Sequence, residues 1–449
     1  MRVLAKDIIQ AVRDNHGRDL EVSGWVHRIR DMGGITFVIL RDRSGLLQLV
    51  FDGKPADSSG ALLTLESVIT AWGIPALNEK APEGVELRVT KLKILSLAAG
   101  DLPYQVNGDV SKTGLEAVLD NRILSLRNPK IRSIFKVQST IVEAFAAYLR
   151  SRDFTEIKSS KLVSAGTEGG TNLFQVEYFD RKVCLAQSPQ FYKEVMVASG
   201  LERVFEIAPV YRAEKHDTPR HLNEYVSLDV EMGFIESEKD LIDLEKNLLA
   251  CIFEELAGKN AKDLEAWGAS VPKAEVAARA PVIPYEESLK IVNLEAAKGK
   301  NSGPRIFDIN PEAERLLCEW AAREKGVDMV FVNEYPRRYR PFYTYPLAGP
   351  QGEDPGAAAL TMSFDCLFRG IEITSGGRRH HEYRAFTEAL PKFGLKPEDM
   401  AGYLSLLRYG CPPHGGFAIG LERLTQKILG LSSVKEASLF PRDRKRVEP

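Results

Sequence analysis

The chain has 449 residues, 44% apolar and 27% charged, with a formal net charge of −2, so any polyanion has to be met by local basic patches. Its five cysteines are odd in number and form no CxxC pair, which argues against a disulfide framework or a structural zinc site. No apolar run reaches the length of a signal-peptide core or a membrane span, so we expect a cytoplasmic protein with no membrane partner.

Residues 1–100 are predicted to form a small β-barrel. After a short helix over residues 7–13, the strand-like segments EVSGWVHRIR, ITFVILRDRSG and LLQLVFDG follow one another. Two more strands near residues 71–74 and 85–97, with a helical connection near 62–68, complete an OB-type barrel. Such barrels bind single-stranded nucleic acid by stacking bases on aromatic rings. The residues alone leave open whether Phe37 is a core residue or a stacking residue.

Beyond the barrel, residues 98–121 carry the Gly, Pro, Asn and Asp punctuation of a linker. Apolar spacing then predicts an amphipathic helix over residues 135–150, followed by the strand FTEIKSSKL. Further helices are expected over 240–256, within 305–325 and over 397–409. Residues 345–358 read as a surface loop, and FDCLFRGIEITSG as a strand-like segment.

Residues 204–234 are predicted to form a hairpin with a charged loop. In its second arm Ser227, Asp229 and Glu231 alternate with apolar residues, which predicts one buried face and one wet face. Arg212 lies on the first arm, and the loop over residues 213–222 holds cationic and acidic residues, among them Glu214, Arg220 and His221. Such a loop suits an anionic, polydentate ligand such as a nucleoside triphosphate, although a solvated hairpin tip is the simpler alternative.

This hairpin resembles motif 2 of the class II aminoacyl-tRNA synthetases, in which Phe/Tyr-Arg-x-Glu precedes a loop and Arg-His. The segments TEGGTNLFQVEYFDRKVCLAQSPQFYKE, GIEITSGGRR and GFAIGLERL resemble the amino-acid pocket, the metal site and motif 3 of the aspartyl-tRNA synthetases of the archaeal and eukaryotic type. The resemblance implies an α+β chain. Its parts are an OB-fold anticodon-binding domain over 1–100, a linker over 101–125 and a catalytic domain over 126–449, built on an antiparallel sheet flanked by helices.

The resemblance also implies an ATP site in the catalytic domain. Arg212 would hold the α-phosphate and the attacking carboxylate, Glu214 the adenine amino group, and Arg423 the adenine and γ-phosphate. Because both reactants are anions, such a site supplies fixed positive charge rather than a nucleophile. The full set of implied ATP-binding residues is Arg212, Ala213, Glu214, Arg220, His221, Leu222, Tyr225, Glu372, Gly420, Leu421, Glu422 and Arg423.

For aspartate and the metal, the resemblance implies two small sets of residues. Lys193 and Arg379 match the two cations that hold the side-chain carboxylate, so that asparagine would leave them unpaired. Glu372 and Ser375 match a Mg²⁺-binding pair completed by phosphate oxygens. The implied aspartate-binding residues are Glu168, Gln190, Lys193, Arg212, Ser375 and Arg379.

Residues of the predicted anticodon-binding barrel bear on a second question, which tRNAs the protein recognises. Phe37, Gln48 and Arg30 match or lie beside positions that meet the anticodon. Enzymes restricted to tRNA(Asp) tend to carry tryptophan where this chain has His27, and lysine where it has Pro82. The chain therefore resembles the non-discriminating enzymes, which also charge tRNA(Asn). A strictly tRNA(Asp)-specific enzyme is the alternative.

The resemblance implies a homodimer that uses motif 1, where the chain departs from the family pattern. Ser160 replaces the usual proline before Lys161, which restores a backbone donor at that position. Two rival functions use related folds: an amide-forming ligase that passes the adenylate to ammonia, and a catalytically silent nucleic-acid-binding protein. The OB-like module argues against the first. The second is opposed by the joint retention of Arg212, Glu214, Glu372, Arg379 and Arg423.

Overall fold

The computed structural model describes residues 2–14, 18–164, 166, 173–215, 217–298, 305–347, 359–393 and 395–448. It separates into two compact units, Met1–Asn128 and Pro129–Pro449, each with its own hydrophobic core. The boundary lies close to the expected start of the catalytic domain at residue 126.

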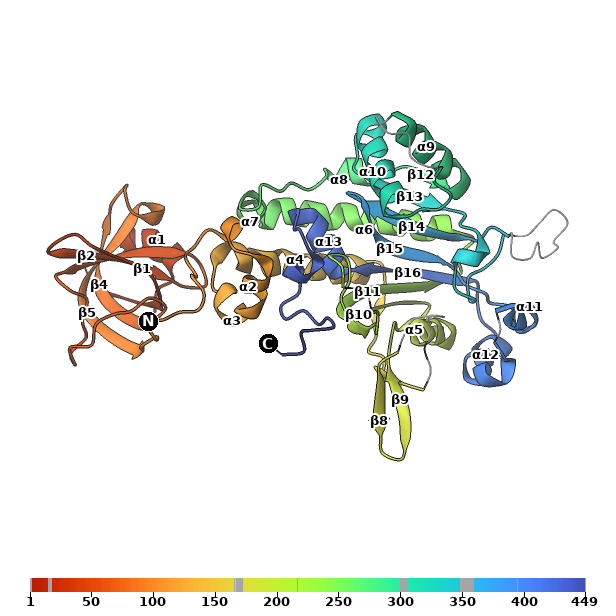
Figure 1. The fold of residues 1–449 in the computed structure, drawn as a ribbon, viewed down its shortest axis with the longest axis horizontal. Helices are drawn as coiled ribbons and strands as arrows, with labels where there is room; N and C mark the ends of the chain where they lie inside the picture. Colours follow the sequence, from red (N-terminus) through yellow and green to blue (C-terminus); the bar gives the residue numbers. More distant parts are fainter. Residues whose placement is uncertain are drawn as a thin grey trace. The chain divides into compact units, whose positions relative to one another are not determined.

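The first unit contains a closed five-stranded barrel in the order β1-β2-β3-β5-β4, as the OB-type prediction requires (Figure 1). The strands are β1 Leu20–Asp31, β2 Ile35–Arg41, β3 Leu46–Asp52, β4 Val68–Leu77 and β5 Val85–Ser96. Alternate positions such as Val26, Val38 and Leu49 are fully buried and fill the interior. The expected N-terminal helix is present as α1, Ile8–Asp14.

Two details of the first unit differ from expectation. The helix predicted near residues 62–68 is wrong: Glu66 has a φ of +66°, which a helix cannot accommodate, and its buried carboxylate pairs with Arg41 at 2.7 Å. The linker predicted over 101–125 is partly helical, since it contains the 3₁₀ turn Val110–Lys112, α2, Leu115–Asp120, and α3, Arg122–Ser125.

The second unit is built on an eight-stranded sheet in the order β12-β13-β14-β15-β16-β11-β10-β6. Its long central strands pair antiparallel, as predicted, and only the outer pairs β12–β13 and β6–β10 are parallel. The strands are β6 Thr155–Glu156, β10 Arg203–Tyr211, β11 Glu224–Gly233, β12 Val282–Pro284, β13 Met329–Asn333, β14 Ser363–Phe368, β15 Ile371–Arg378 and β16 His414–Gly420.

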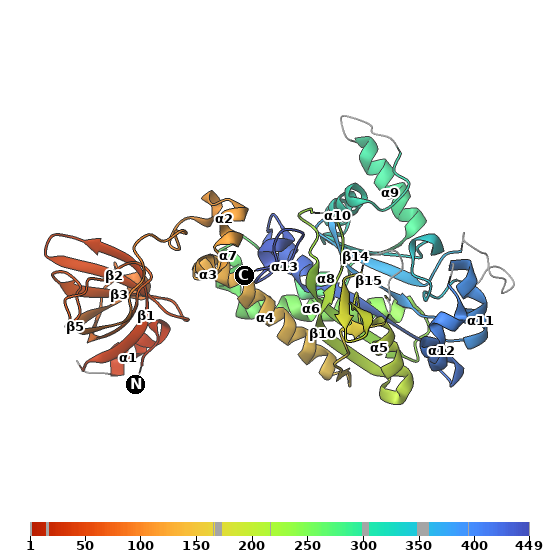
Figure 2. The ribbon, with the colours of Figure 1, turned by 60° about the horizontal axis from the view of Figure 1, so that its bottom comes forward.

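Helices cover this sheet. The long helices α4 and α6 lie side by side and, with α13, form the main apolar core (Figure 2). A capping box between Ser237 and Asp240 fixes the start of α6, and Gly326, at a φ of +70°, ends α10. The helices of this unit are α4 Pro129–Arg150, α5 Gln190–Met196, α6 Glu238–Lys259, α7 Ala261–Glu265, α8 Ala274–Ala277, α9 Tyr285–Lys298, α10 Pro311–Lys325, α11 Tyr383–Ala389, α12 Ala401–Arg408 and α13 Leu421–Leu429.

A small three-stranded sheet accompanies the large one, from which its β8–β9 hairpin projects (Figure 1). It consists of β7 Leu162–Val163, β9 Arg181–Leu185 and β8 Gln175–Tyr178. The expected single strand FTEIKSSKL is wrong, because β6 and β7 divide it between the two sheets. FDCLFRGIEITSG, expected to be strand-like, forms the hairpin β14–β15, which turns at Arg369 and Gly370 with φ values of +47° and +79°.

The hairpin predicted over residues 204–234 is confirmed as β10–β11. The second arm differs from the prediction in one respect: the face expected to be exposed to solvent is buried. Its polar residues, Ser227, Asp229 and Glu231, are at most 5% exposed. Ser227 and Asp229 line a cavity instead of facing solvent. Most of the loop predicted over residues 345–358 lies outside the described residues.

Candidate active site

A cavity of about 330 Å³ lies over the middle of the large sheet, where β15, β16 and β11 are neighbours. A volume of this order is in the range of about 300–1,000 Å³ that small-molecule sites occupy. Most of the residues that the sequence singles out meet here: Gln190, Lys193, Arg212, Glu214, Arg220, His221, Leu222, Tyr225, Glu372, Ser375, Arg379, Gly420, Glu422 and Arg423. Side chains from four separate motifs therefore share one cavity.

Two expected residues of the described part of the chain are not brought into this lining. Leu421 is 5% exposed and packs in the main apolar core, and Ala213 is not a lining residue. Glu168 lies outside the described residues.

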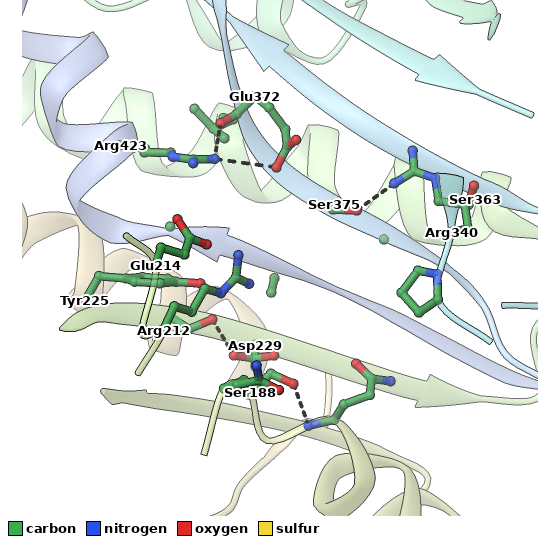
Figure 3. Close-up of a pocket in the computed structure, with 18 of the residues that line it drawn as sticks. Ser188, Arg212, Glu214, Tyr225, Asp229, Arg340, Ser363, Glu372, Ser375 and Arg423 are labelled. Atoms are coloured by element: carbon green, nitrogen blue, oxygen red, sulfur yellow. Dashed lines mark hydrogen bonds and ion pairs between the residues drawn. The ribbon is translucent and has the colours of Figure 1, made fainter. Parts of the chain in front are cut away.

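The β10–β11 hairpin forms one side of the cavity. Arg212 directly follows β10, and its guanidinium carbon lies 5.4 Å from the ring centroid of Tyr225, within the range of a cation–π contact (Figure 3). Asn223 donates from Nδ2 to the carbonyl oxygens of Arg212, at 2.7 Å, and Glu214, at 3.1 Å. These bonds hold the two sides of the charged loop together beside the cavity.

Motif 3 and β15 form the opposite side. Nη1 of Arg423 lies 3.2 Å from the carbonyl oxygen of Glu372 and 3.5 Å from its carboxylate (Figure 3). Arg220 pairs with Glu314 of α10. Arg220 and Arg423, two of the residues implied to bind ATP, therefore rest on carboxylates at the edge of the cavity, and a nucleotide would have to replace these partners.

The two cations expected to read the substrate side chain are deeply buried. Lys193 lies 3.0 Å from Asp229 and 3.2 Å from Glu231, and Arg379 lies 3.1 Å from Glu231. The expectation that only the substrate would pair them is wrong, since a buried charge without a partner carries a large free-energy cost. Nη1 of Arg379 nevertheless has no acceptor among the described residues, so one donor of the guanidinium is left for a ligand.

Arg340 belongs to the site but was missed by sequence reasoning. It donates from Nη1 to Ser375 at 3.0 Å (Figure 3). The same nitrogen donates to Asp365 at 2.8 Å, and the guanidinium carbon lies 3.7 Å from the ring centroid of Tyr335. The signal available in the sequence was the dense run of arginine, tyrosine and proline in EYPRRYRPFYTYP. No periodicity distinguishes such a run from a charged loop.

The surroundings of Glu372 and Ser375 fit a divalent cation shared with phosphate oxygens. Burial and the neighbouring carboxylate of Asp365 raise the pKa of Glu372 to about 6. Asp365 is also the cross-strand partner of Ser375, so carboxylate and hydroxyl oxygens lie on neighbouring strands here. The described residues contain no group of three His, Cys, Asp or Glu side chains placed to hold a metal by themselves. A hard cation that takes the rest of its oxygen ligands from phosphate and water, as Mg²⁺ does, matches this donor set.

The expected anticodon residues lie on the barrel. Arg30 and Phe37 are cross-strand neighbours on the outer face of β1 and β2, and Phe37 is half-buried and outside the barrel core. Gln48, on β3, donates to Glu86 at 3.1 Å, and Pro82 begins the 3₁₀ turn before β5. The open question about Phe37 is settled against a core position.

His27 lies at an irregularity in the pairing of β1 with β2, where a β-bulge redirects side chains. Nη1 of Arg41 donates to its Nδ1 at 2.8 Å. Burial and the charge of Arg41 lower the pKa of His27 to about 4, so the ring is neutral near pH 7 and carries its proton on Nε2.

Comparison with known proteins agrees with both units. The family model of class II tRNA synthetases for aspartate, lysine and asparagine matches residues 114–444, and the model of the OB-fold nucleic acid binding domain matches residues 20–95. The chain therefore belongs to the class II aminoacyl-tRNA synthetases, which use ATP.

Within that class, the chain belongs to the aspartate–tRNA ligase family. It is 44% identical to the aspartate–tRNA(Asp/Asn) ligase of Deinococcus radiodurans, with 99% of each chain covered. It is 39% identical to the aspartate–tRNA(Asp) ligase of Pyrococcus horikoshii, with 97% of each covered. Among solved structures, asparaginyl-tRNA synthetase from Pyrococcus horikoshii with asparaginyl-adenylate superimposes with a TM-score of 0.85 at 29% identity, and 96% of each chain is covered.

Proposed function

We propose that this protein attaches L-aspartate to tRNA(Asp) and also to tRNA(Asn), through an aspartyl-adenylate. The observation that carries the proposal is the convergence of Lys193, Arg212, Arg379 and Arg423 on one cavity. In the first step an oxygen of the α-carboxylate of aspartate attacks the α-phosphorus of ATP, and pyrophosphate leaves. In the second step a ribose hydroxyl of the tRNA attacks the anhydride carbon, and AMP leaves.

Arg212 and Arg423 are the proposed catalytic residues. Arg212 holds the α-phosphate and the attacking carboxylate together, which removes the repulsion between two anions and stabilises the charge that grows on phosphorus. Arg423 and the adenine-facing residues fix the nucleotide from the other side of the cavity. When bound at Glu372 and Ser375, Mg²⁺ would withdraw charge from the phosphate oxygens.

Discrimination between aspartate and asparagine is assigned to Lys193, Arg379 and Gln190. Nη1 of Arg379 has no acceptor among the described residues, so it can donate to a carboxylate oxygen of aspartate. It cannot accept a hydrogen bond from the amide nitrogen of asparagine, because both groups are donors. An asparagine side chain would thus leave a buried donor and a buried amide imperfectly paired, at a cost of about 1–3 kcal/mol for each unsatisfied group.

Charging of both tRNAs is the finer part of the proposal. It is supported by the higher identity to the aspartate–tRNA(Asp/Asn) ligase than to the aspartate–tRNA(Asp) ligase, 44% against 39%. It is also supported by His27, a compact neutral ring held by Arg41 at the position where the resemblance implies a larger tryptophan for tRNA(Asp)-restricted enzymes.

Side-by-side charging of purified tRNA(Asp) and tRNA(Asn) with labelled aspartate tests this proposal. We expect both tRNAs to be charged by the wild type. The variant His27→Trp should lower charging of tRNA(Asn) relative to tRNA(Asp) by about tenfold or more, which corresponds to about 1.4 kcal/mol.

Charging of tRNA(Asp) alone by the wild type would show a discriminating enzyme. Adenylate formation without charging of either tRNA would instead indicate an amide-forming ligase. The absence of both adenylate formation and charging would indicate a silent binding protein.

The proposed assembly is a cytoplasmic homodimer. Ser160, at the motif 1 departure, is exposed and donates to the carbonyl oxygen of Leu162 at 3.1 Å, within the turn between β6 and β7. The turn is therefore closed by a side-chain bond where the family has a proline. No described helix is both long and apolar enough to cross a membrane.

A further inference from the structure

A buried network lies behind the residues proposed to read the substrate side chain. Gln190 and Glu194 are four residues apart on α5, so their side chains share one helix face. Nε2 of Gln190 donates to Oε1 of Glu194 at 2.7 Å. The other carboxylate oxygen of Glu194 accepts from the hydroxyl of Tyr403 at 2.6 Å and from Nε2 of His414 at 2.9 Å. Glu194 is fully buried and has both of its oxygens satisfied.

His414 carries a positive charge in this network. Its Nε2 faces the carboxylate of Glu194, and its Nδ1 faces the carbonyl oxygen of Pro412, at 2.9 Å each. The thiol of Cys411, 3.4 Å from Nδ1, has the same carbonyl as its own acceptor. Because a carboxylate and a carbonyl only accept, both ring nitrogens must hold protons. Although burial opposes the charge, the bonds to Cys411 and Glu194 raise the pKa of His414 to about 10.

The charges of the whole cluster cancel only if His414 is included. The cluster contains six ionisable side chains, each at most 5% exposed. Three are cations and three are carboxylates: Lys193, Arg379 and His414, and Glu194, Asp229 and Glu231. Without the imidazolium the cluster would carry one excess negative charge. A buried excess charge acts strongly over short distances, and here it would repel an anionic side chain.

The same network fixes the orientation of Gln190. Because its amide nitrogen is committed to Glu194, its oxygen points the other way and accepts from Nη2 of Arg379 at 3.4 Å. That nitrogen of Arg379 also donates to the carbonyl oxygen of Gly416 at 3.0 Å, and Nε donates to Glu231 at 3.1 Å. The guanidinium is thereby held so that Nη1 is the donor left for a ligand.

We propose that the Glu194–His414 ion pair is a positioning and charge-balancing element that sets the affinity of the site for the side-chain carboxylate of aspartate. It acts through Gln190 and Arg379 and does not touch the substrate. The inference rests on the proposed function, because it takes aspartate as the substrate.

Three variants test the charge balance in the full-length protein by aspartate-dependent exchange of pyrophosphate into ATP. His414→Gln leaves Glu194 without its counter-charge, so KM for aspartate should rise about tenfold or more while KM for ATP changes less than about twofold. The double variant Glu194→Gln with His414→Gln restores neutrality and should recover most of that loss. Tyr403→Phe removes a hydrogen bond but no charge, and its effect should be the smallest.

Glu238→Gln is the matched control, because Glu238 is a buried carboxylate that bonds to Asn333 away from this cluster. It should leave KM for aspartate unchanged. If His414→Gln does not fold, the double variant still decides. Restored neutrality predicts a KM for aspartate within about threefold of the wild type, whereas a purely structural pair predicts an increase of about tenfold or more.

Equal increases in KM for aspartate and ATP, or no recovery in the double variant, would overturn the inference. A wild type without aspartate-dependent exchange would overturn the proposed function instead, so the two failures are distinguishable.

Discussion

Single residues in this protein show how burial changes the charge that a side chain carries. Glu245 of α6 is fully buried beneath β14 and β15, and burial together with the carboxylate of Asp365 raises its pKa from 4.5 to about 8. It is therefore protonated in the folded protein near neutral pH. Cys366 lies in the same region, and burial raises the pKa of its thiol as well.

This gives a prediction about stability and pH. The folded state keeps a proton on Glu245 that the unfolded state loses above its ordinary pKa, so the contribution of this residue to stability falls as pH rises from about 4.5 to about 8. Glu245→Gln is neutral at every pH and should remove that fall. Thermal unfolding should show little difference from the wild type at pH 4.5 and a higher melting temperature of the variant at pH 8. A difference of the same size at both pH values would contradict the assignment.

Among the elements, strands with a clear alternation were predictable and buried polar faces were not. Both arms of the β10–β11 hairpin follow from a period of two residues. The polar face of β11 can be buried because Lys193 and Arg379 pair with its carboxylates. These two cations lie 36 and 148 positions away from their partners in the sequence. The β14–β15 turn was missed because Arg369 takes a positive φ, which a residue other than glycine rarely adopts.

Strand β16 provides a test at this scale. A Cβ on Gly416 would lie 2.0 Å from the carbonyl oxygen of Val230 and 2.1 Å from Oε2 of Glu231, so β16 can pass Glu231 only with glycine here. Gly416→Ala should destabilise the fold by about 1–3 kcal/mol. It should also abolish most aspartate-dependent exchange, because Glu231 anchors both Lys193 and Arg379.

Gly402→Ala is the control for that variant. Gly402 lies in α12 with nothing within 4 Å of an added Cβ, and alanine there should be neutral or stabilising by up to about 1 kcal/mol. A Gly416→Ala enzyme that is as stable and as active as the Gly402→Ala enzyme would contradict the close packing of β16 on Glu231.

At the scale of the whole molecule, the division into two compact units predicts that variants can lose tRNA binding without losing pyrophosphate exchange. Motif order was enough to predict an OB-type barrel followed by a class II catalytic sheet. The residues alone left the outward position of Phe37 open, because its strand is apolar on both faces. We expect Phe37→Ala to weaken tRNA binding by about 5- to 150-fold, the loss of one base-stacking contact of about 1–3 kcal/mol.

Exchange of pyrophosphate should be unchanged in Phe37→Ala, since activation needs no tRNA contact on the barrel. Phe179→Ala removes an aromatic side chain that is 91% exposed elsewhere on the molecule and should affect neither reaction. A loss of exchange in Phe37→Ala, or an equal loss of tRNA binding in both variants, would contradict the assignment of the barrel face.

The central claim is that one cavity joins aspartate to the α-phosphorus of ATP. Exchange of labelled pyrophosphate into ATP by the purified wild-type protein with Mg²⁺, measured with aspartate and separately with asparagine, tests it most directly. The account predicts exchange that depends on aspartate and is at least about a hundredfold weaker with asparagine, as expected when buried donors lose their partner. No exchange with aspartate, or equal exchange with asparagine, would contradict it.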